Sequence, residues 1–128
     1  MPDLMLARIG QIAVVVQDVE RAAAFYRDVL GLRLLFTAPP GLAFFDCGGV
    51  RLMLSRPEGA ASAAGTSVLY YVVAGIHAAY DTLRERGVQF EDAPHLVAKL
   101  PDHDLWLVTF RDSEGNLVAL MDEVRPPA

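Results

Sequence analysis

Residues 9–31 read Ile-Gly-Gln-Ile-Ala-Val-Val-Val-Gln-Asp-Val-Glu-Arg-Ala-Ala-Ala-Phe-Tyr-Arg-Asp-Val-Leu-Gly, and this stretch decides the fold. Its first part, residues 9–17, is short, apolar and β-branched, which predicts a buried strand. Asp18 follows at a helix N-cap position, where a carboxylate can accept from the first free N–H groups. Apolar residues recur at spacings of three and four through residues 19–30, which predicts a helix that ends at Gly31. We expect this helix to bury Ala22, Phe25, Tyr26 and Val29.

The same order of strand and helix returns in the second half of the chain. Residues 67–74 form another apolar run, and residues 76–86 have helical spacing before Gly87. Gly31 and Gly87 lie 56 positions apart, which indicates an internal repeat. Further strands are expected at 32–36, 42–47 and 50–55, and at 88–91, 96–100, 105–112 and 117–121. We therefore predict one α+β domain over residues 1–128, with modules at about 8–56 and 67–122 and a linker at about 57–66.

Composition narrows the range of partners. The 128 residues carry a net charge of −5 without a cluster of Lys and Arg, which argues against nucleic acid and anionic membranes as partners. No apolar run is long enough to cross a membrane, and the start of the sequence lacks the pattern of a signal peptide. Cys47 is the single cysteine, which excludes an intramolecular disulfide and favours an inert thiol. We therefore expect a cytoplasmic protein.

Three motifs carry a resemblance to a known family. They are Val-Gln-Asp-Val-Glu-Arg-Ala at 16–22, Phe-Tyr-Arg-Asp-Val-Leu-Gly-Leu at 25–32 and Phe-Arg-Asp-Ser-Glu-Gly-Asn-Leu-Val at 110–118. With these motifs the chain resembles the vicinal oxygen chelate superfamily, which includes glyoxalase I, extradiol dioxygenases, bleomycin-resistance proteins and methylmalonyl-CoA epimerase. The resemblance implies two βαβββ modules that form a curved eight-stranded cup around a ligand, with two flanking helices. It also implies a homodimer.

The resemblance further implies a metal site with four ligands, from the first and last strands of each module. Carried over to this sequence, the four positions hold Gln11, Met53, Val68 and Ala119. Val and Ala have no lone pair, and Met is a soft donor, whereas hard divalent ions require oxygen or imidazole ligands. We therefore expect no metal at these positions and no cofactor.

Strand alternation predicts which side chains line the cup in the first module. A two-residue turn at Gly48 and Gly49 pairs Asp46 with Arg51 and places Met53 two positions further along the strand. Asp46 and Arg51 would then form an ion pair at the rim of the cup. The alternative is an ordinary surface pair of little energetic value.

In the second module the predicted lining depends on two turns. Pairing Arg111 with Val118 across the last turn would place Phe110 and Trp106 on the cup face. A turn at residues 102–103 would then set Lys99 opposite Trp106 and His95 opposite Phe110. The full set of expected ligand-binding residues is Tyr70, Trp106, Phe110, Met53, Met121, Arg51, Lys99, Asp46 and Gln11.

Two histidines are candidates for chemistry. His95 is the expected catalytic residue, as a general acid or base, because histidine titrates nearest to neutral pH. His103 is interpreted as a residue of the turn Pro-Asp-His-Asp at 101–104. The alternative is a metal site outside the family pattern, formed by His95, Asp102, His103 and Asp104.

The sequence leaves two functional hypotheses. The first is a protein of the bleomycin-resistance type that binds a small organic molecule in an apolar, aromatic cup without a metal. The second is an enzyme of the same superfamily, a lyase, an isomerase or a dioxygenase-like protein, that acts on a small organic substrate without the usual metal or with an atypical one. The identity of the ligand does not follow from the sequence.

Overall fold

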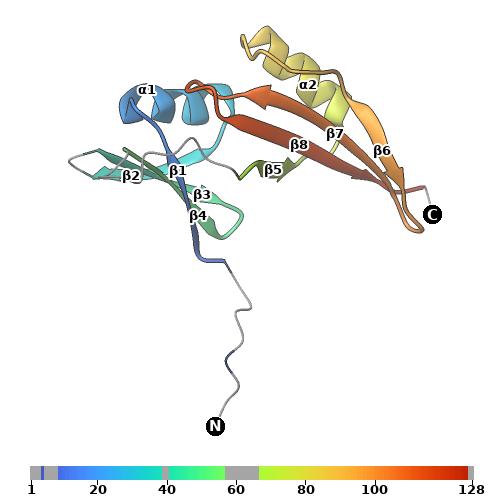
Figure 1. Ribbon diagram of the computed structural model, residues 1–128, viewed down its shortest axis with the longest axis horizontal. Coiled ribbons are helices and arrows are strands. Elements are labelled where there is room, and N and C mark those ends of the chain that lie inside the picture. The colour runs from blue at the N-terminus through green and yellow to red at the C-terminus, as the bar shows by residue number, and fades with distance from the viewer. Residues whose placement is uncertain (1–3, 5–8, 39–40, 57–66, 127–128) are drawn as a thin grey trace. The chain divides into compact units, whose positions relative to one another are not determined.

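The computed structural model describes residues 4, 9–38, 41–56 and 67–126. The chain divides into two compact units, Met1–Ala63 and Ala64–Ala128, each with a four-stranded sheet and its own helix (Figure 1). The linker predicted at 57–66 lies outside the described residues. In the described part of the chain, no helix is long and apolar enough to cross a lipid bilayer.

The first unit follows the predicted order of elements. These are β1 (Gln11–Val15), α1 (Val19–Ala24), a π-helical turn η1 (Phe25–Val29), β2 (Arg33–Ala38), β3 (Leu42–Cys47) and β4 (Val50–Ser55). The strands lie in the order β1-β4-β3-β2, with β1 parallel to β4 and the other neighbours antiparallel. The predicted hairpin around Gly48 and Gly49 is confirmed, and both glycines have the positive φ that a tight hairpin turn requires.

The second unit repeats this arrangement. Its elements are β5 (Leu69–Val72), α2 (Ile76–Glu85), β6 (His95–Lys99), β7 (Asp104–Arg111) and β8 (Leu117–Val124). The strand order β5-β8-β7-β6 is the counterpart of the first sheet, with β5 parallel to β8. The strand predicted at 88–91 is wrong, because this segment forms a single bridge between Phe90 and Phe110. The predicted α+β fold with two like modules is confirmed.

The first helix starts as predicted but changes type halfway. The Asp18 carboxylate accepts from the backbone N–H of Arg21 at 2.9 Å. The turn that follows is wider, because the N–H of Leu30 donates to the carbonyl of Phe25, five residues earlier, at 3.1 Å. Tyr26 is buried as expected, whereas Phe25 is only half-buried. Of the other two expected core residues, Ala22 is buried and Val29 is half-buried.

The second helix receives its N-cap from a distant strand. Gly75 occupies the position that matches Asp18 and has no side chain to cap the helix. Asp122, on β8, accepts from the N–H groups of Gly75 and Ile76, both at 3.0 Å. Asp122 is 7% exposed, and its two hydrogen bonds tie the start of α2 to the sheet from inside the unit.

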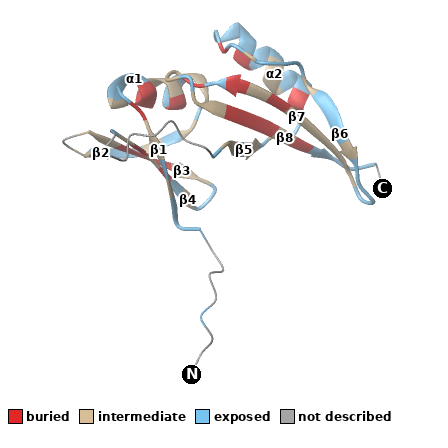
Figure 2. Cartoon of the chain, viewed as in Figure 1, coloured by how far each residue is buried: buried red, intermediate tan, exposed pale blue. Residues whose placement is uncertain are grey.

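Each helix covers one face of its own sheet, and the core of the unit lies between them (Figures 1 and 2). In the first unit, the ring of Tyr26 contacts that of Phe45, with centroids 6.2 Å apart, and Leu52 and Leu54 are buried beside them. In the second unit, Phe90 joins α2 to the sheet, because its ring contacts both Tyr80 and Phe110. The face of each sheet that points away from its helix is called the open face below.

Candidate functional site

The open face of the first unit carries all four predicted binding residues of that unit, Gln11, Asp46, Arg51 and Met53. Strand neighbours of the buried residues Phe45, Leu52 and Leu54 point to this face. The register forms two rows across the sheet. The polar row is Arg33, Asp46, Arg51 and Gln11, and the apolar row is Phe36, Phe44, Met53 and Ala13.

The polar row departs from the expected ion pair. Asp46 and Arg51 are register partners, as predicted. The Arg51 guanidinium nevertheless makes no ion pair with Asp46 among the described residues, and its Nε donates instead to Oε1 of Gln11 at 2.9 Å. The Asp46 carboxylate accepts from the N–H of Gly49 at 3.4 Å within the turn. The parallel pairing of β1 with β4 explains this choice, because it sets Gln11 directly beside Arg51.

The apolar row contains an aromatic stack. The rings of Phe36 and Phe44 lie 4.6 Å apart at 28°, and the Arg51 guanidinium stands 5.4 Å from the centre of the Phe44 ring. Phe36 is 48% exposed, although it belongs to a stack on a sheet. Neither Phe36 nor Phe44 is among the expected binding residues. A β-bulge between Leu34 and Phe36 resets the alternation along β2, so simple alternation from Arg33 would place Phe36 on the other face.

Two of the four positions that the family uses for a metal lie in this unit. The amide Nε2 of Gln11 donates weakly to Sδ of Met53 at 3.8 Å. The one hard donor of the pair, Oε1 of Gln11, already accepts from the cationic guanidinium of Arg51. A thioether and an amide beside a guanidinium do not match the oxygen and imidazole ligands of a divalent ion.

The other two family positions lie in the second unit and offer no donor. Val68 precedes β5, and Ala119 on β8 is fully buried beside Tyr70. Neither side chain has a lone pair, so these residues do not fit a metal either. The part of the chain that the structure describes also contains no group of three His, Cys, Asp or Glu residues placed to hold one.

The open face of the second unit differs from the prediction in two strands, β7 and β6. Tyr70 and Met121 lie on it as expected, because Tyr70 pairs with Ala119 and Met121 with Val72. The strand β7 contributes Leu107 and Thr109 to this face, rather than Trp106 and Phe110. Tyr70 is 53% exposed and Met121 is half-buried.

Trp106 and Phe110 lie on the helix side of the sheet, so their predicted place on the cup face is wrong. Phe110 pairs with Val118, one position away from the expected register, and Trp106 pairs with Asp122. The Trp106 ring contacts that of His77 on α2, with centroids 5.2 Å apart. These two side chains and Asp122 border a hollow of about 450 Å³ at the start of α2.

The predicted partners of β6 are also wrong. His95 pairs with Leu107, which keeps it on the open face, although not opposite Phe110. A β-bulge between Leu96 and Ala98 then turns Lys99 to the face of its partner Asp104, the helix side. Lys99 is therefore not placed with His95.

His95 belongs to a small polar cluster that the sequence did not reveal. Its ring Nδ1 lies 3.0 Å from the carbonyl oxygen of Ala93 and 3.7 Å from Oδ2 of Asp92. The other carboxylate oxygen of Asp92 accepts from the backbone N–H of Thr109 at 2.9 Å and from its hydroxyl at 3.2 Å. With Nδ1 as the donor to Ala93, Nε2 is the proton acceptor of the ring.

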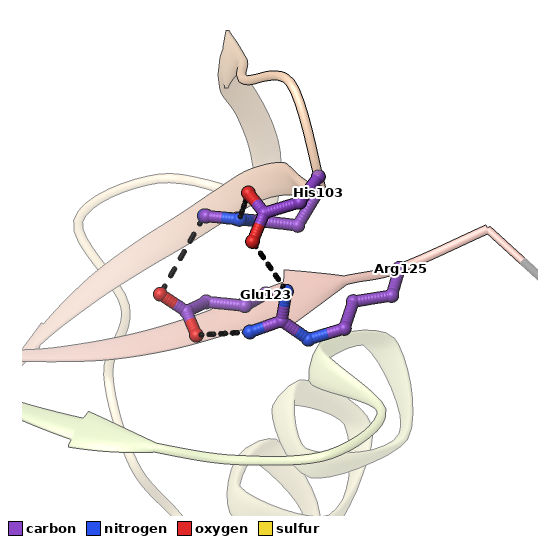
Figure 3. Close-up of polar contacts among 4 residues, drawn as sticks. His103, Glu123 and Arg125 are labelled. Carbon is purple, nitrogen blue, oxygen red and sulfur yellow. Dashed lines mark hydrogen bonds and ion pairs between the residues drawn. The ribbon is translucent and has the colours of Figure 1, made fainter.

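His103 takes part in a separate ring of ion pairs (Figure 3). Its Nδ1 lies 2.7 Å from Asp102, and its Nε2 lies 3.5 Å from Glu123. Arg125 closes the ring, at 3.0 Å from Asp102 and 3.3 Å from Glu123. The hydrogen bonds from His103 and Arg125 hold the pKa of Asp102 below its usual range. His95 is absent from this group of described residues, so the alternative metal site of His95 with His103 is not formed.

Comparison with known proteins assigns the family. The model of the Glyoxalase/Bleomycin resistance protein/Dioxygenase superfamily matches residues 8–120. The chain belongs to this superfamily. Uncharacterized protein YraH of Bacillus subtilis (strain 168) is 29% identical over 129 residues, which cover 88% of this chain and 96% of that protein.

Solved structures share the fold of this superfamily member. Lactoylglutathione lyase from Agrobacterium tumefaciens is 25% identical with a TM-score of 0.74, over 91% of this chain and 93% of that one. TnmS3, an antibiotic binding protein from Streptomyces sp. CB03234, is 24% identical with a TM-score of 0.74, over 94% of this chain and 99% of that one.

Proposed function

We propose that this protein binds a small organic molecule on the open face of the first unit, without a metal ion. The observation that carries the proposal is the Phe36–Phe44 stack beside Met53. Phe36, which is 48% exposed and stacks on the buried ring of Phe44, leaves apolar surface in contact with water, and apolar surfaces with few polar groups are typical of ligand sites. Gln11, Asp46 and Arg51 supply those polar groups.

The donor chemistry supports binding without a metal. Gln11 and Met53 occupy family metal positions, but the Gln11 amide donates to the Met53 sulfur and accepts from the Arg51 guanidinium. Relatives support both binding and catalysis as general uses of the fold, because one solved neighbour is described as an antibiotic binding protein and another as a lyase. The choice between ligand binding and catalysis therefore depends on the residues of this chain.

Ligand-observed NMR with a panel of small aromatic compounds tests the proposal. We expect Phe36→Ala to weaken binding about tenfold, because it removes one side of the stack. Leu35→Ala is the matched control, since Leu35 is 42% exposed on the same strand and should leave binding unchanged. If Phe36→Ala and the parent protein bind the panel equally, the proposed site is wrong. Elemental analysis that finds one tightly held metal per chain would contradict binding without a metal.

A second candidate function is acid–base catalysis by His95. The Asp92–His95 contact and the Ala93 carbonyl fix the ring so that Nε2 can accept a proton from a substrate. If a turnover is found, His95→Gln should abolish it, whereas Asp92→Asn should lower kcat with a smaller effect on KM. Equal turnover by His95→Gln and the parent protein would exclude this role.

A further inference from the structure

The charge environment of Arg51 points to the chemistry of the ligand. A guanidinium stays charged at all physiological pH values and has five N–H donors. Within the described residues, Nε of Arg51 donates to the neutral amide of Gln11, and no carboxylate lies within ion-pair distance of the guanidinium. Three other exposed arginines of this acidic chain, Arg27, Arg111 and Arg125, pair with carboxylates, whereas the described residues give Arg33 and Arg84 no ion pair.

Two contacts hold the guanidinium in place on the open face. Gln11 Oε1 accepts its Nε proton, and the Phe44 ring lies 5.4 Å below its central carbon. Nη1 and Nη2 therefore form the free end of a fixed, planar donor group. Such a group matches a carboxylate, which can accept two parallel N–H···O bonds.

The apolar row lies next to this donor. Arg51 and Met53 are two positions apart on β4, which corresponds to about 7 Å along the strand. Phe36 and Phe44 continue the apolar row across the sheet. A flat ring joined to a carboxylate could therefore lie on this row while its carboxylate reaches the guanidinium.

We propose that Arg51, together with the Phe36–Phe44 stack, selects planar aromatic carboxylates as ligands of the open face. The inference rests on the proposed function, since it names the ligand class of the same site. A cationic ligand is repelled by Arg51, and a neutral amide lacks the charge that strengthens the paired hydrogen bonds.

The test compares probes that share a naphthalene ring and carry a negative, neutral or positive substituent. The probes are 2-naphthoate, 2-naphthamide and 2-naphthylmethylamine, with binding measured by calorimetry and by the NMR shift of the Arg51 Nε–H signal. We expect the parent protein to bind the carboxylate at least about tenfold more tightly than the amide, and the amine more weakly still. Arg51→Gln should reduce the preference for the carboxylate to about one, whereas Arg51→Lys should keep part of it as a simple charge.

Controls separate this inference from the proposed function. Arg27→Gln removes the same charge from the same unit at a site paired with Asp28, so it should leave the preference unchanged. Thermal melts of each variant establish that the fold is retained. Suppose that the amide or the amine binds as tightly as the carboxylate, and that Phe36→Ala still weakens binding of the probes. The charge selection is then wrong, and the proposed site stands. If Arg51→Gln retains the preference, the inference is also wrong. If none of the three probes binds, as when a second copy covers this face, both proposals fail.

Discussion

Asp46 affects the chemistry of its neighbour Cys47. Partial burial raises the pKa of the Cys47 thiol, and the Asp46 carboxylate raises it further by repulsion of the thiolate. We expect iodoacetamide to alkylate Cys47 more slowly in the folded protein than in urea. Asp46→Asn should accelerate the folded-state reaction about two- to threefold, because it removes the repulsion. Glu20→Gln is a control on α1, and equal rates for Asp46→Asn and the parent protein would contradict the assignment.

The ring around His103 predicts a pH dependence of stability. The pKa of Asp102 is lowered in the folded state, first by its hydrogen bond from His103 and then by that from Arg125. A lowered pKa stabilises the fold above the unfolded-state pKa of the carboxyl, and this contribution is lost as the pH falls through the folded-state pKa.

Thermal melts of Asp102→Asn test this linkage. We expect a small decrease in Tm at neutral pH, because the contacts lie at an exposed site. The difference from the parent protein should disappear in strong acid, where the Asp102 carboxyl is protonated in both states. A difference that stays constant down to strong acid would show that the effect of the substitution is not due to charge.

At the scale of elements, the N-cap of α2 can be tested by a single substitution. Asp122 replaces the side chain that Gly75 lacks, and it accepts from two N–H groups. We expect Asp122→Ala to lower the free energy of unfolding by about 1–2 kcal/mol, the usual range for loss of an N-cap. Urea unfolding measures the change, and Asp81→Ala, exposed on the same helix, is the control with little expected effect. Equal losses for the two variants would argue against the cap.

The β3–β4 and β7–β8 hairpins show when the strand register can be predicted from the sequence and when it cannot. Gly48 and Gly49 form a two-residue turn, which fixes the register of β3 and β4 through backbone geometry alone. The turn at residues 112–116 is held by the Asp112 carboxylate, which accepts from the N–H groups of Glu114 and Asn116. Its length sets Arg111 opposite Leu117, one position from the prediction.

The hydrophobic pattern of β7 does not reveal this one-residue error in register. Leu105 and Leu107 lie on one face, and Trp106, Val108 and Phe110 lie on the other, so both faces are apolar. Hydrophobic alternation specifies register only where one face is polar. The bulge in β6 is a second source of error, because it changes the face of Lys99 without a sequence marker. The bulge in β2 has the same effect on Phe36.

Because Trp106 lies on the helix side of its sheet, its substitution should affect stability rather than ligand binding. Half-buried against His77, Trp106 contributes to the packing of α2 on its sheet. Trp106→Ala should therefore lower the free energy of unfolding by about 2 kcal/mol, somewhat less than for a fully buried ring. Urea unfolding measures this, and binding of 2-naphthoate per folded molecule should be unchanged. Weaker binding with unchanged stability would instead support the original placement on the cup face.

At the scale of the whole molecule, the internal repeat is the most predictable feature. Both units have the same strand order, and in both a parallel pair joins the first and last strands. The repeat is visible in the sequence because hydrophobic spacing and terminal glycines mark each helix. The two caps differ between the units: Asp18 caps α1 from three residues before Arg21, whereas Asp122 caps α2 from 46 residues beyond Ile76. The pattern of one unit therefore does not predict the cap of the other.

Exposed edge strands lead to a last prediction, that two copies of the chain associate. β5 is an edge strand of its sheet, and it leaves Tyr70 53% and Val72 72% exposed. Apolar side chains on an open strand edge favour pairing with another chain. Light scattering should therefore give twice the chain mass of 13.9 kDa. Val72→Lys should shift the protein toward the monomer, because it places a charge on that edge, whereas Thr82→Lys on the exposed side of α2 should not. A monomer mass for the parent protein over a hundredfold range of concentration would refute the association.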